Sequence, residues 1–478
     1  MGARVLKVGV GSDELAAGIA TIQQEQHVTP EFPPEVERAA EQAAASPRLP
    51  ELDLTAIELV TIDPEGAMDL DQAMHLERDG AGYVVHYAIA DVAAFVTAGD
   101  PVDREAHARG ESLYGADSKV PLHPKVLSEG AASLLPDQER PAFVWTIALD
   151  ADGAVTSARV ERARVRSRAR LDYVAVDARL AEEPEGSTLA LLEVVGELRI
   201  AQEAARGGVS LPMPAQEIDV EDGVARLEFR SMLPVENWNA QISLLTGFCA
   251  ASMMLEHRVG VLRTLPPAPD GAVRRLRSTA RALGIDWPAD VGHADFIRGL
   301  DPQVPAEAAM VVAATTLLRG AAYVTFDGEL PEQTQHAALA SAYAHVTAPL
   351  RRLVDRFGLE VCAAISAGTP VPAWVLEAWP VLPEEMRDSG RRSHAYENAV
   401  LNLLEALTLR DRVGETFPAV VLETEHDDEE RGTVMLSEPA VEAPVSSTSA
   451  LPVGEAVQVR LAAADVATRK VRFELDAG

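Results

Sequence analysis

The order of strand-like and helix-like patterns limits the fold of this chain more than any other feature of its sequence. Segments with strand character come first, at residues 57–62, 83–92, 142–149 and 159–170. The main helical patterns follow them, at residues 236–256, 306–319, 350–366 and 391–409. A doubly wound fold would alternate strands with helices, so this order predicts an α+β domain in which helices flank a mixed sheet.

The length predicts more than one folding unit, because 478 residues are too many for a single compact core. Residues 1–50 predict a short helical head with helices at 13–24 and 34–45. Residues 51–412 predict one large domain without internal repeats. Residues 413–478 contain short strand-like pieces that predict a small OB-type β-barrel, a fold that commonly binds oligonucleotides.

The sequence carries no signal for export or for membrane insertion. Its longest apolar run, residues 308–318, is well short of the roughly 20 residues that a bilayer requires. The N-terminus has no sustained apolar stretch before a cleavage site. Cys249 and Cys362 lie far apart in apolar sequence, as buried, reduced thiols do. We therefore expect a cytoplasmic protein, and no feature indicates an obligate protein partner.

The overall charge argues against a nucleic-acid partner, but the distribution of arginines does not. The chain has 42 basic and 74 acidic residues, for a net charge of −32. Arginines nevertheless recur at every second position from Arg162 to Arg170, a period that places them on one face of a strand. This row is either a solvated strand face or a wall that tracks the phosphates of a nucleic acid.

Aspartates gather after the first predicted strand. Asp63 ends that strand, and Asp69 and Asp71 follow a loop that contains Pro64 and Gly66. Asp69 and Asp71 are two residues apart and point the same way in extended backbone, and the loop can fold Asp63 back toward them. Hard oxygen ligands without nearby cysteine favour Mg²⁺ or Mn²⁺ over zinc. A solvated acidic turn would give the same spacing.

Further motifs accompany the aspartates in a fixed order. They are HYAIADVAAFV at residues 86–96, a tyrosine-to-proline segment at 112–143, SRARLDY at 167–173 and YAHVTAPLRR at 343–352, followed by Asp355. Together with TIDPEGAMDLDQA at 61–73, this series resembles the catalytic domain of the ribonuclease II and ribonuclease R family, which is called the RNB domain. The resemblance runs from residue 51 to 412 and implies an RNB-type catalytic domain.

The resemblance implies a catalytic role for four residues. Asp63, Asp69 and Asp71, with Gln72 beside them, would hold Mg²⁺ or Mn²⁺ at the scissile phosphate, where the metal neutralises developing charge and activates water. Arg351 matches the arginine that clamps phosphate, a task that suits the planar fork of a guanidinium. The implied reaction is hydrolysis of single-stranded RNA from its 3′ end to nucleoside 5′-monophosphates.

The resemblance also implies a set of residues that contact RNA. Tyr114 falls on the tyrosine that stacks against the terminal base, which suits an enzyme that must accept any base. The remaining RNA-binding candidates are Tyr173, Arg166, Arg168, Arg170, Arg352 and Glu397.

The sequence departs from the family pattern at several points. Gln72 replaces a fourth carboxylate, which removes one negative charge from the expected metal site. Pro266 or Pro267 stands near the place of a second base-stacking aromatic, and Ala240 near that of a glutamate. Family members usually carry two cold-shock modules before the catalytic domain, whereas residues 1–50 are too few for even one. We expect a Gln72→Asp variant to bind metal more tightly, unless the amide donates a hydrogen bond to Asp69 or to the phosphate.

These departures leave three interpretations open. The first is an active 3′-to-5′ exoribonuclease. The second is an RNB-type RNA-binding protein whose catalysis is weakened or lost through Gln72. The third is a metal-dependent phosphohydrolase for small nucleotides, which would not depend on RNA length.

Overall fold

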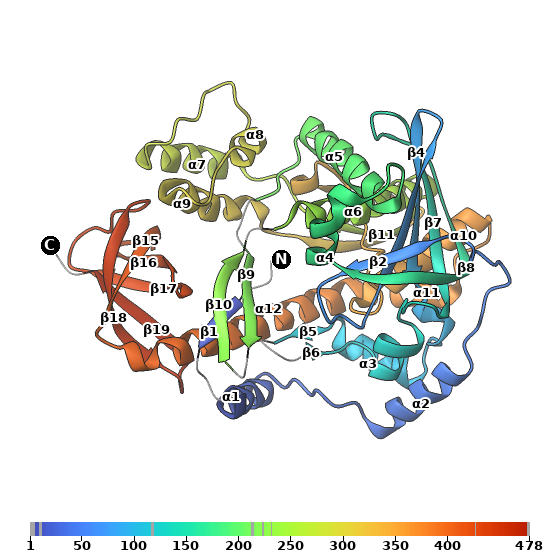
Figure 1. Ribbon diagram of the computed structural model, residues 1–478, viewed down its shortest axis with the longest axis horizontal. Coiled ribbons are helices and arrows are strands. Elements are labelled where there is room, and N and C mark those ends of the chain that lie inside the picture. The colour runs from blue at the N-terminus through green and yellow to red at the C-terminus, as the bar shows by residue number, and fades with distance from the viewer. Residues whose placement is uncertain are drawn as a thin grey trace.

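Two closed β-barrels lie at opposite ends of the computed structural model, with helices around and between them (Figure 1). The structure describes residues 5–8, 12–115, 119–211, 215–221, 224–230, 232–425 and 427–475. The mixture of helices and sheets confirms the predicted α+β class. No helix in these ranges is both long and apolar enough to cross a membrane.

The first barrel, here called the catalytic barrel, contains all of the strands predicted in the first half of the chain. It closes in the order β2 (Leu59–Asp63), β3 (Gln72–Asp79), β4 (Gly82–Ala90), β7 (Glu139–Leu149) and β8 (Val155–Asp172). Neighbouring strands are antiparallel except β2 and β8, whose parallel pairing closes the barrel. Strand β3 was not predicted, because its second half is the polar run Glu77, Arg78 and Asp79.

Long helices cover the catalytic barrel and bring the second half of the chain to it. They include α5 (Thr188–Arg206), α6 (Pro234–His257), α10 (Leu353–Ala367) and α12 (Leu382–Leu409). Their apolar faces share one core with barrel residues such as Trp145, which is fully buried. The predicted helices at 236–256 and 391–409 are thus confirmed. The one predicted from 350 begins later, at Leu353, because Pro349 to Arg352 form a turn.

The second barrel, here called the C-terminal barrel, confirms the predicted OB-type fold. Its strands are β15 (Thr416–Glu425), β16 (Asp428–Ser437), β17 (Ala440–Ser447), β18 (Ala456–Asp465) and β19 (Lys470–Leu475). They close in the order β15, β16, β17, β19, β18, with β17 and β19 parallel. Strand β17 was not predicted, because its proline and serines are typical of loops.

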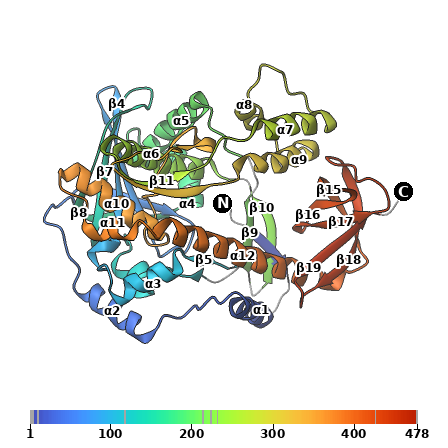
Figure 2. The ribbon, with the colours of Figure 1, turned by 180° about the vertical axis from the view of Figure 1, so that it is seen from behind.

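A helical unit joins the two barrels on one side, and the head joins them on the other. Helices α7 (Asp270–Ala282), α8 (His293–Arg298) and α9 (Pro305–Ala314) have a core of their own, and α9 lies against β15. Helix α1 (Ser12–Glu25) of the head packs along α12, as the view from behind shows (Figure 2). Head residues therefore share a core with the rest of the chain.

Candidate active site

The acidic loop between β2 and β3 is held in place by the segment that precedes β7. Gly66 adopts a positive φ of 79°, which lets the chain reverse after Asp63. Leu70 is fully buried, and its N–H donates to Ser133 Oγ at 3.0 Å. Asp69 and Asp71 flank the buried Leu70 and lie close enough for Asp69 to contribute to the raised pKa of Asp71.

The signature segment at residues 343–352 closes over this loop. The N–H of Leu350 donates to Asp71 Oδ1 at 2.7 Å, and Arg351 Nε lies 3.7 Å from Asp71 Oδ2. Asp71 is 3% exposed on its side chain, whereas Arg351 is 43% exposed. The buried carboxylate therefore positions Leu350 and Arg351, and the guanidinium of Arg351 keeps access to solvent.

Burial raises the pKa of two of the aspartates. The pKa of Asp63 rises to about 7, because its carboxyl is buried and because Asp69 is close, while Arg351 and Arg170 oppose the rise. The pKa of Asp71 lies well above its usual range, again mainly through burial. Asp63 Oδ2 is also buried and accepts no hydrogen bond. Negative charge at this site is thus poorly compensated by the protein.

These residues fit a divalent cation. Among the described residues no group of three His, Cys, Asp or Glu side chains is arranged to hold a metal ion, so the aspartates do not form a complete cage. Mg²⁺ does not need one, since it is commonly held by one or two carboxylates together with water and substrate phosphate. The unpartnered Oδ2 of Asp63 and the carboxylate of Asp71 are the oxygens that such an ion would compensate.

Gln72 faces the signature segment. Its side-chain amide donates to the backbone carbonyl of Thr347, a contact between residues 275 positions apart. The sequence suggested Asp69 or a phosphate as partners for this amide, so the observed partner differs from both. A carboxylate at position 72 could not donate this hydrogen bond.

Lys119 belongs to the site although the sequence did not indicate it. Strands β5 (Leu113–Tyr114) and β6 (Lys119–Val120) form a hairpin in which Lys119 is paired with Tyr114. The Lys119 ammonium lies 2.8 Å from Asp69 Oδ2 and 3.4 Å from Glu129 Oε1. The only available signal was its position within the matched segment at 112–143.

The two predicted tyrosines lie on different sides of the acidic loop. Tyr114 is 41% exposed, and burial of its phenol together with Asp69 and Asp71 raises its pKa, although Arg351 opposes this. The hydroxyl of Tyr173, at the start of α4 (Tyr173–Arg179), accepts a hydrogen bond from Asn239 at 3.1 Å. Burial and the nearby Asp63 raise the pKa of Tyr173 to about 12.

Helix α6 contributes two residues that the sequence reasoning missed. Asn239 also donates to the carbonyl of Ile62 at 3.3 Å, and Ser243 donates to Thr347 Oγ1 at 2.8 Å. They are four residues apart and therefore on one helix face, a polar pair within an apolar pattern that could have marked them. Both link α6 to the segments that carry the aspartates and Arg351.

Arg352 and Glu397 lie in a separate charged cluster. Arg352 donates to both oxygens of buried Asp355, through Nε and Nη2, at 2.8 Å each. Burial raises the pKa of neighbouring Glu111; Arg352 lowers it and Glu397 raises it further. The structure thus gives Arg352 a positioning role at the start of α10, and its contact with RNA stays a prediction, as does that of Glu397.

The arginine row on β8 does face one way, but most of it is engaged by acids. Arg162 pairs with Asp91 and Glu360, and Arg164 with Asp53 and Glu139, so these arginines stabilise the barrel surface. Arg166 lies 3.8 Å from Glu139 Oε2, and Arg168 and Arg170 donate to backbone carbonyls. A continuous phosphate wall is therefore not what the row forms.

The far end of the row remains the best candidate for RNA contact. Arg168 and Arg170 are exposed and line a hollow beside the acidic loop, together with Met68, Leu135 and Gln138. Arg170 also lowers the pKa of Asp63, which places it within electrostatic reach of the carboxylates.

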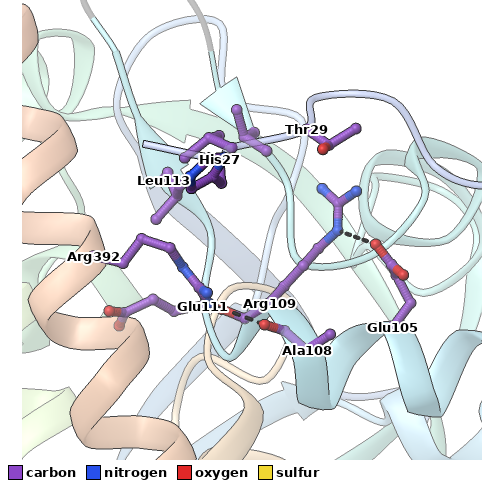
Figure 3. A pocket seen from close by; sticks show the side chains of 10 residues that line it. His27, Thr29, Glu105, Ala108, Arg109, Glu111, Leu113 and Arg392 are labelled. Carbon is purple, nitrogen blue, oxygen red and sulfur yellow. Dashed lines mark hydrogen bonds and ion pairs between the residues drawn. The ribbon is translucent and has the colours of Figure 1, made fainter. Parts of the chain in front are cut away.

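A second hollow lies behind the hairpin that carries Tyr114 and Lys119. Figure 3 shows Arg109 of α3 (Pro101–Arg109) and Arg392 of α12 beside Leu113 in this hollow. Arg109 donates to the carbonyls of Pro121 at 3.1 Å and Glu31 at 3.0 Å. The head thus supports the hairpin from behind.

Two segments of the chain match known protein families. Residues 51–358 match the RNB domain, and residues 415–476 match the RNase II-type exonuclease C-terminal S1 domain. Ribonuclease R of Escherichia coli is 28% identical over 398 residues, which cover 77% of this chain and 48% of that protein. Ribonuclease R of Vibrio cholerae is 26% identical over 454 residues, covering 87% and 54%. The chain spans about half the length of these relatives.

Solved structures share the fold. RNase R of Mycoplasma genitalium, in complex with ribose methylated single-stranded RNA, has a TM-score of 0.85 at 20% identity, covering 97% of this chain and 78% of that chain. Yeast Ssd1, described as a pseudonuclease, has a TM-score of 0.73 at 16% identity, covering 90% and 55%. With its RNB domain and its C-terminal S1 domain, the chain belongs to the RNB family of RNase II-type exonucleases.

Proposed function

We propose that this chain is a divalent-metal-dependent exoribonuclease that removes nucleotides from the 3′ end of single-stranded RNA. The observation that carries the proposal is the buried pair of carboxylates, Asp63 and Asp71, held against a solvent-accessible Arg351 by the Leu350 hydrogen bond. Buried carboxylates, one of them with the unpartnered oxygen Asp63 Oδ2, beside an accessible guanidinium suit a site that receives both a cation and a phosphate.

Each residue of the site has a defined task in this proposal. Asp63 and Asp71 would hold the divalent cation, which supplies a Lewis acid for the scissile phosphate and lowers the pKa of the attacking water. Arg351 binds the phosphate oxygens through its exposed guanidinium. Tyr114 offers an exposed ring for stacking with the terminal base, a contact that every base can make.

The choice of RNA as substrate rests on family membership and on surface chemistry. The relatives carry the name Ribonuclease R, and one similar structure contains single-stranded RNA. Arg168, Arg170 and Met68 line the hollow beside the acidic loop, where a flexible single strand could lie. Action in the cytoplasm and the release of nucleoside 5′-monophosphates are part of the same proposal.

A second candidate is an RNA-binding protein without nuclease activity. Two observations favour it: Gln72 stands where the family pattern has a carboxylate, and the fold is also similar to that of the pseudonuclease Ssd1. The poorly compensated carboxylates of Asp63 and Asp71 favour the active enzyme instead, since buried negative charge is not needed to bind RNA alone.

Digestion of a 5′-labelled oligoribonucleotide, and of the DNA of the same sequence, separates the two candidates. With Mg²⁺ or Mn²⁺ the enzyme should shorten the RNA stepwise to a small end product, leave the DNA intact and stop when EDTA is added. RNA that is retarded on a native gel but never shortened with either metal would make the chain an RNA-binding protein. Equal hydrolysis of mononucleotide substrates would indicate a small-nucleotide phosphohydrolase.

A further inference from the structure

The ammonium of Lys119 is fixed inside the carboxylate cluster. The side chains of Lys119, Asp69 and Glu129 are only 19%, 17% and 24% exposed, at distances of 2.8 Å and 3.4 Å from nitrogen to oxygen. Solvent screens exposed ion pairs, whereas the Coulomb attraction within partly desolvated pairs such as these is stronger. Lys125 makes the contrast clear, since it is 71% exposed and lies 3.9 Å from Glu129.

Backbone pairing fixes the lysine as well. In the β5–β6 hairpin Tyr114 is paired with Lys119, and Ser112 Oγ accepts the N–H of Leu122 at 2.9 Å just beyond the hairpin. The tyrosine proposed to stack on the terminal base and the lysine on Asp69 are therefore cross-strand partners.

Lys119 leaves two aspartates of the loop for a cation. Its ammonium occupies Asp69 Oδ2, whereas Asp63 Oδ2 accepts no hydrogen bond and the buried carboxylate of Asp71 lies 3.7 Å from the exposed Arg351. One or two carboxylates, together with water and substrate phosphate, commonly hold one Mg²⁺. Gln72 adds no charge, and its amide is engaged with Thr347.

We propose that Lys119 is a positioning residue that supplies a built-in positive charge at Asp69, so that this chain works with one divalent metal ion while the lysine occupies the carboxylate that a second ion would need. The inference rests on the proposed function and specifies its metal stoichiometry. Two of the three ammonium hydrogens serve Asp69 and Glu129, and the third is free to donate to a phosphate oxygen of bound RNA.

The lysine and a metal ion compete for the same carboxylate. Removing the charge of Lys119 leaves the carboxylate of Asp69 without its ion-pair partner, close to the carboxylate of Asp63. A second cation should then bind, because two neighbouring carboxylates repel each other until a cation compensates them. The second cation would be less well positioned than the ammonium of Lys119, because the strand pairing that holds Lys119 would not hold the cation. Metal binding should increase while catalysis decreases, which is the opposite of what loss of a metal ligand produces.

The test measures Mn²⁺ binding by titration calorimetry and RNA cleavage under single-turnover conditions, on the full chain. The variants are Lys119→Met and the charge-conserving Lys119→Arg, with Lys125→Met as the matched control. The parent, Lys119→Arg and Lys125→Met should bind one Mn²⁺. Lys119→Met should bind two and cleave about 100-fold more slowly, the loss that follows removal of one preorganised charge-stabilising group.

Any other pattern overturns the inference. If the parent binds two Mn²⁺, Lys119 does not take the place of a metal ion. If Lys119→Met cleaves RNA at the parent's rate, Lys119 has no positioning role. A slow Lys119→Met that still binds one Mn²⁺, or a Lys119→Arg as slow as it, makes the effect structural. A parent that cleaves no RNA refutes the proposed function, whereas the Mn²⁺ stoichiometry tests the lysine independently of activity.

Discussion

The catalytic barrel and the C-terminal barrel are both closed and both filled with apolar side chains, yet they treat ionisable groups in opposite ways. At the strand ends of the catalytic barrel, burial raises the pKa of Asp63 to about 7. In the C-terminal barrel Asp465 is exposed, and hydrogen bonds from Thr468 lower its pKa. Asp63 thus has an oxygen without a hydrogen-bond partner, whereas Asp465 accepts hydrogen bonds from Ala467 and Thr468.

The difference comes from what covers the strand ends. The acidic loop of the catalytic barrel is enclosed by the 343–352 segment, by α6 and by the β5–β6 hairpin, which exclude water from its carboxylates. In the C-terminal barrel, by contrast, the ion pair between Arg460 of β18 and Glu474 of β19 lies at the surface, with side chains that are 41% and 38% exposed. The two barrels thus differ in what encloses their loops and not in whether they close.

The largest effect should come from Asp71→Asn. The rate of cleavage should fall more than about 1000-fold, because the amide lacks the negative charge that holds a divalent cation, while the Kd for RNA should change less than about threefold, since phosphate contacts lie elsewhere. Single-turnover cleavage and filter binding measure the two quantities. Asp79→Asn, at the exposed far end of β3, is the control. Parent-like cleavage by the Asp71→Asn variant would place the chemistry elsewhere.

Arg351→Ala should lower the cleavage rate about 100-fold at saturating RNA, because it removes a preorganised donor to the phosphate. Its exposed guanidinium makes a purely structural effect small. Arg391→Ala, a change at an arginine that is 72% exposed, should leave the rate unchanged. Steady-state kinetics measure both variants. If Arg351→Ala cleaved RNA as fast as Arg391→Ala, Arg351 would have no role in cleavage.

Gln72→Asp should slow cleavage about tenfold and raise the Mg²⁺ requirement, because it loses the hydrogen bond to Thr347 and sets a carboxylate against that carbonyl. This reverses the expectation from sequence. Titration of activity with Mg²⁺ measures it, with Gln72→Met as the variant that loses only the hydrogen bond. A lower Mg²⁺ requirement in Gln72→Asp would mean that the original expectation was right.

His123 should make the stability of the folded chain fall at acidic pH. It is buried, hydrogen-bonded to Pro349 of the signature segment, and burial lowers its pKa to about 3 from 6.5. Between these values the unfolded chain binds the proton and the folded chain does not, so stability is full above pH 6.5 and is lost as the pH falls toward 3.

His123→Gln should therefore show a smaller loss of thermal stability than the parent as the pH falls from 6.5 toward 3. The loss is reduced and not abolished, since burial lowers the pKa of His336 and His345 as well. Melting curves at a series of pH values measure it. An unchanged pH dependence would remove His123 from this explanation.

The smallest effect should come from the C-terminal barrel. Lys470→Ala with Arg472→Ala removes two exposed cations from β19 and should weaken RNA binding by a few fold, with the slope of log Kd against log salt reduced by about 1.4. Cleavage of RNA too short to reach this barrel should not change. A slower rate on such short RNA would contradict the separation between the barrels.

Local patterns predicted what depends on neighbours in sequence. The alternation of β8 and the apolar face of α6 both follow from the period of a strand or helix. The OB-type barrel followed from short apolar pieces at regular spacing. These features need no knowledge of distant contacts.

Contacts between distant segments could not be predicted. The partners of Lys119, Gln72 and the β8 arginines lie many residues away, so the sequence shows a charge without showing what neutralises it. The row from Arg162 to Arg170 has the predicted orientation, and only the fold reveals that Asp91 and Glu360 engage its first member.

Release of the terminal nucleotide from RNA labelled at its 3′ end tests the central claim most directly. With Mn²⁺, the parent should release the label as a nucleoside 5′-monophosphate in its first turnover, before any shortened RNA lacking more than one nucleotide appears, and EDTA should prevent this. Label that stays on intact RNA with saturating Mn²⁺, or that leaves first within a longer fragment, would contradict the account.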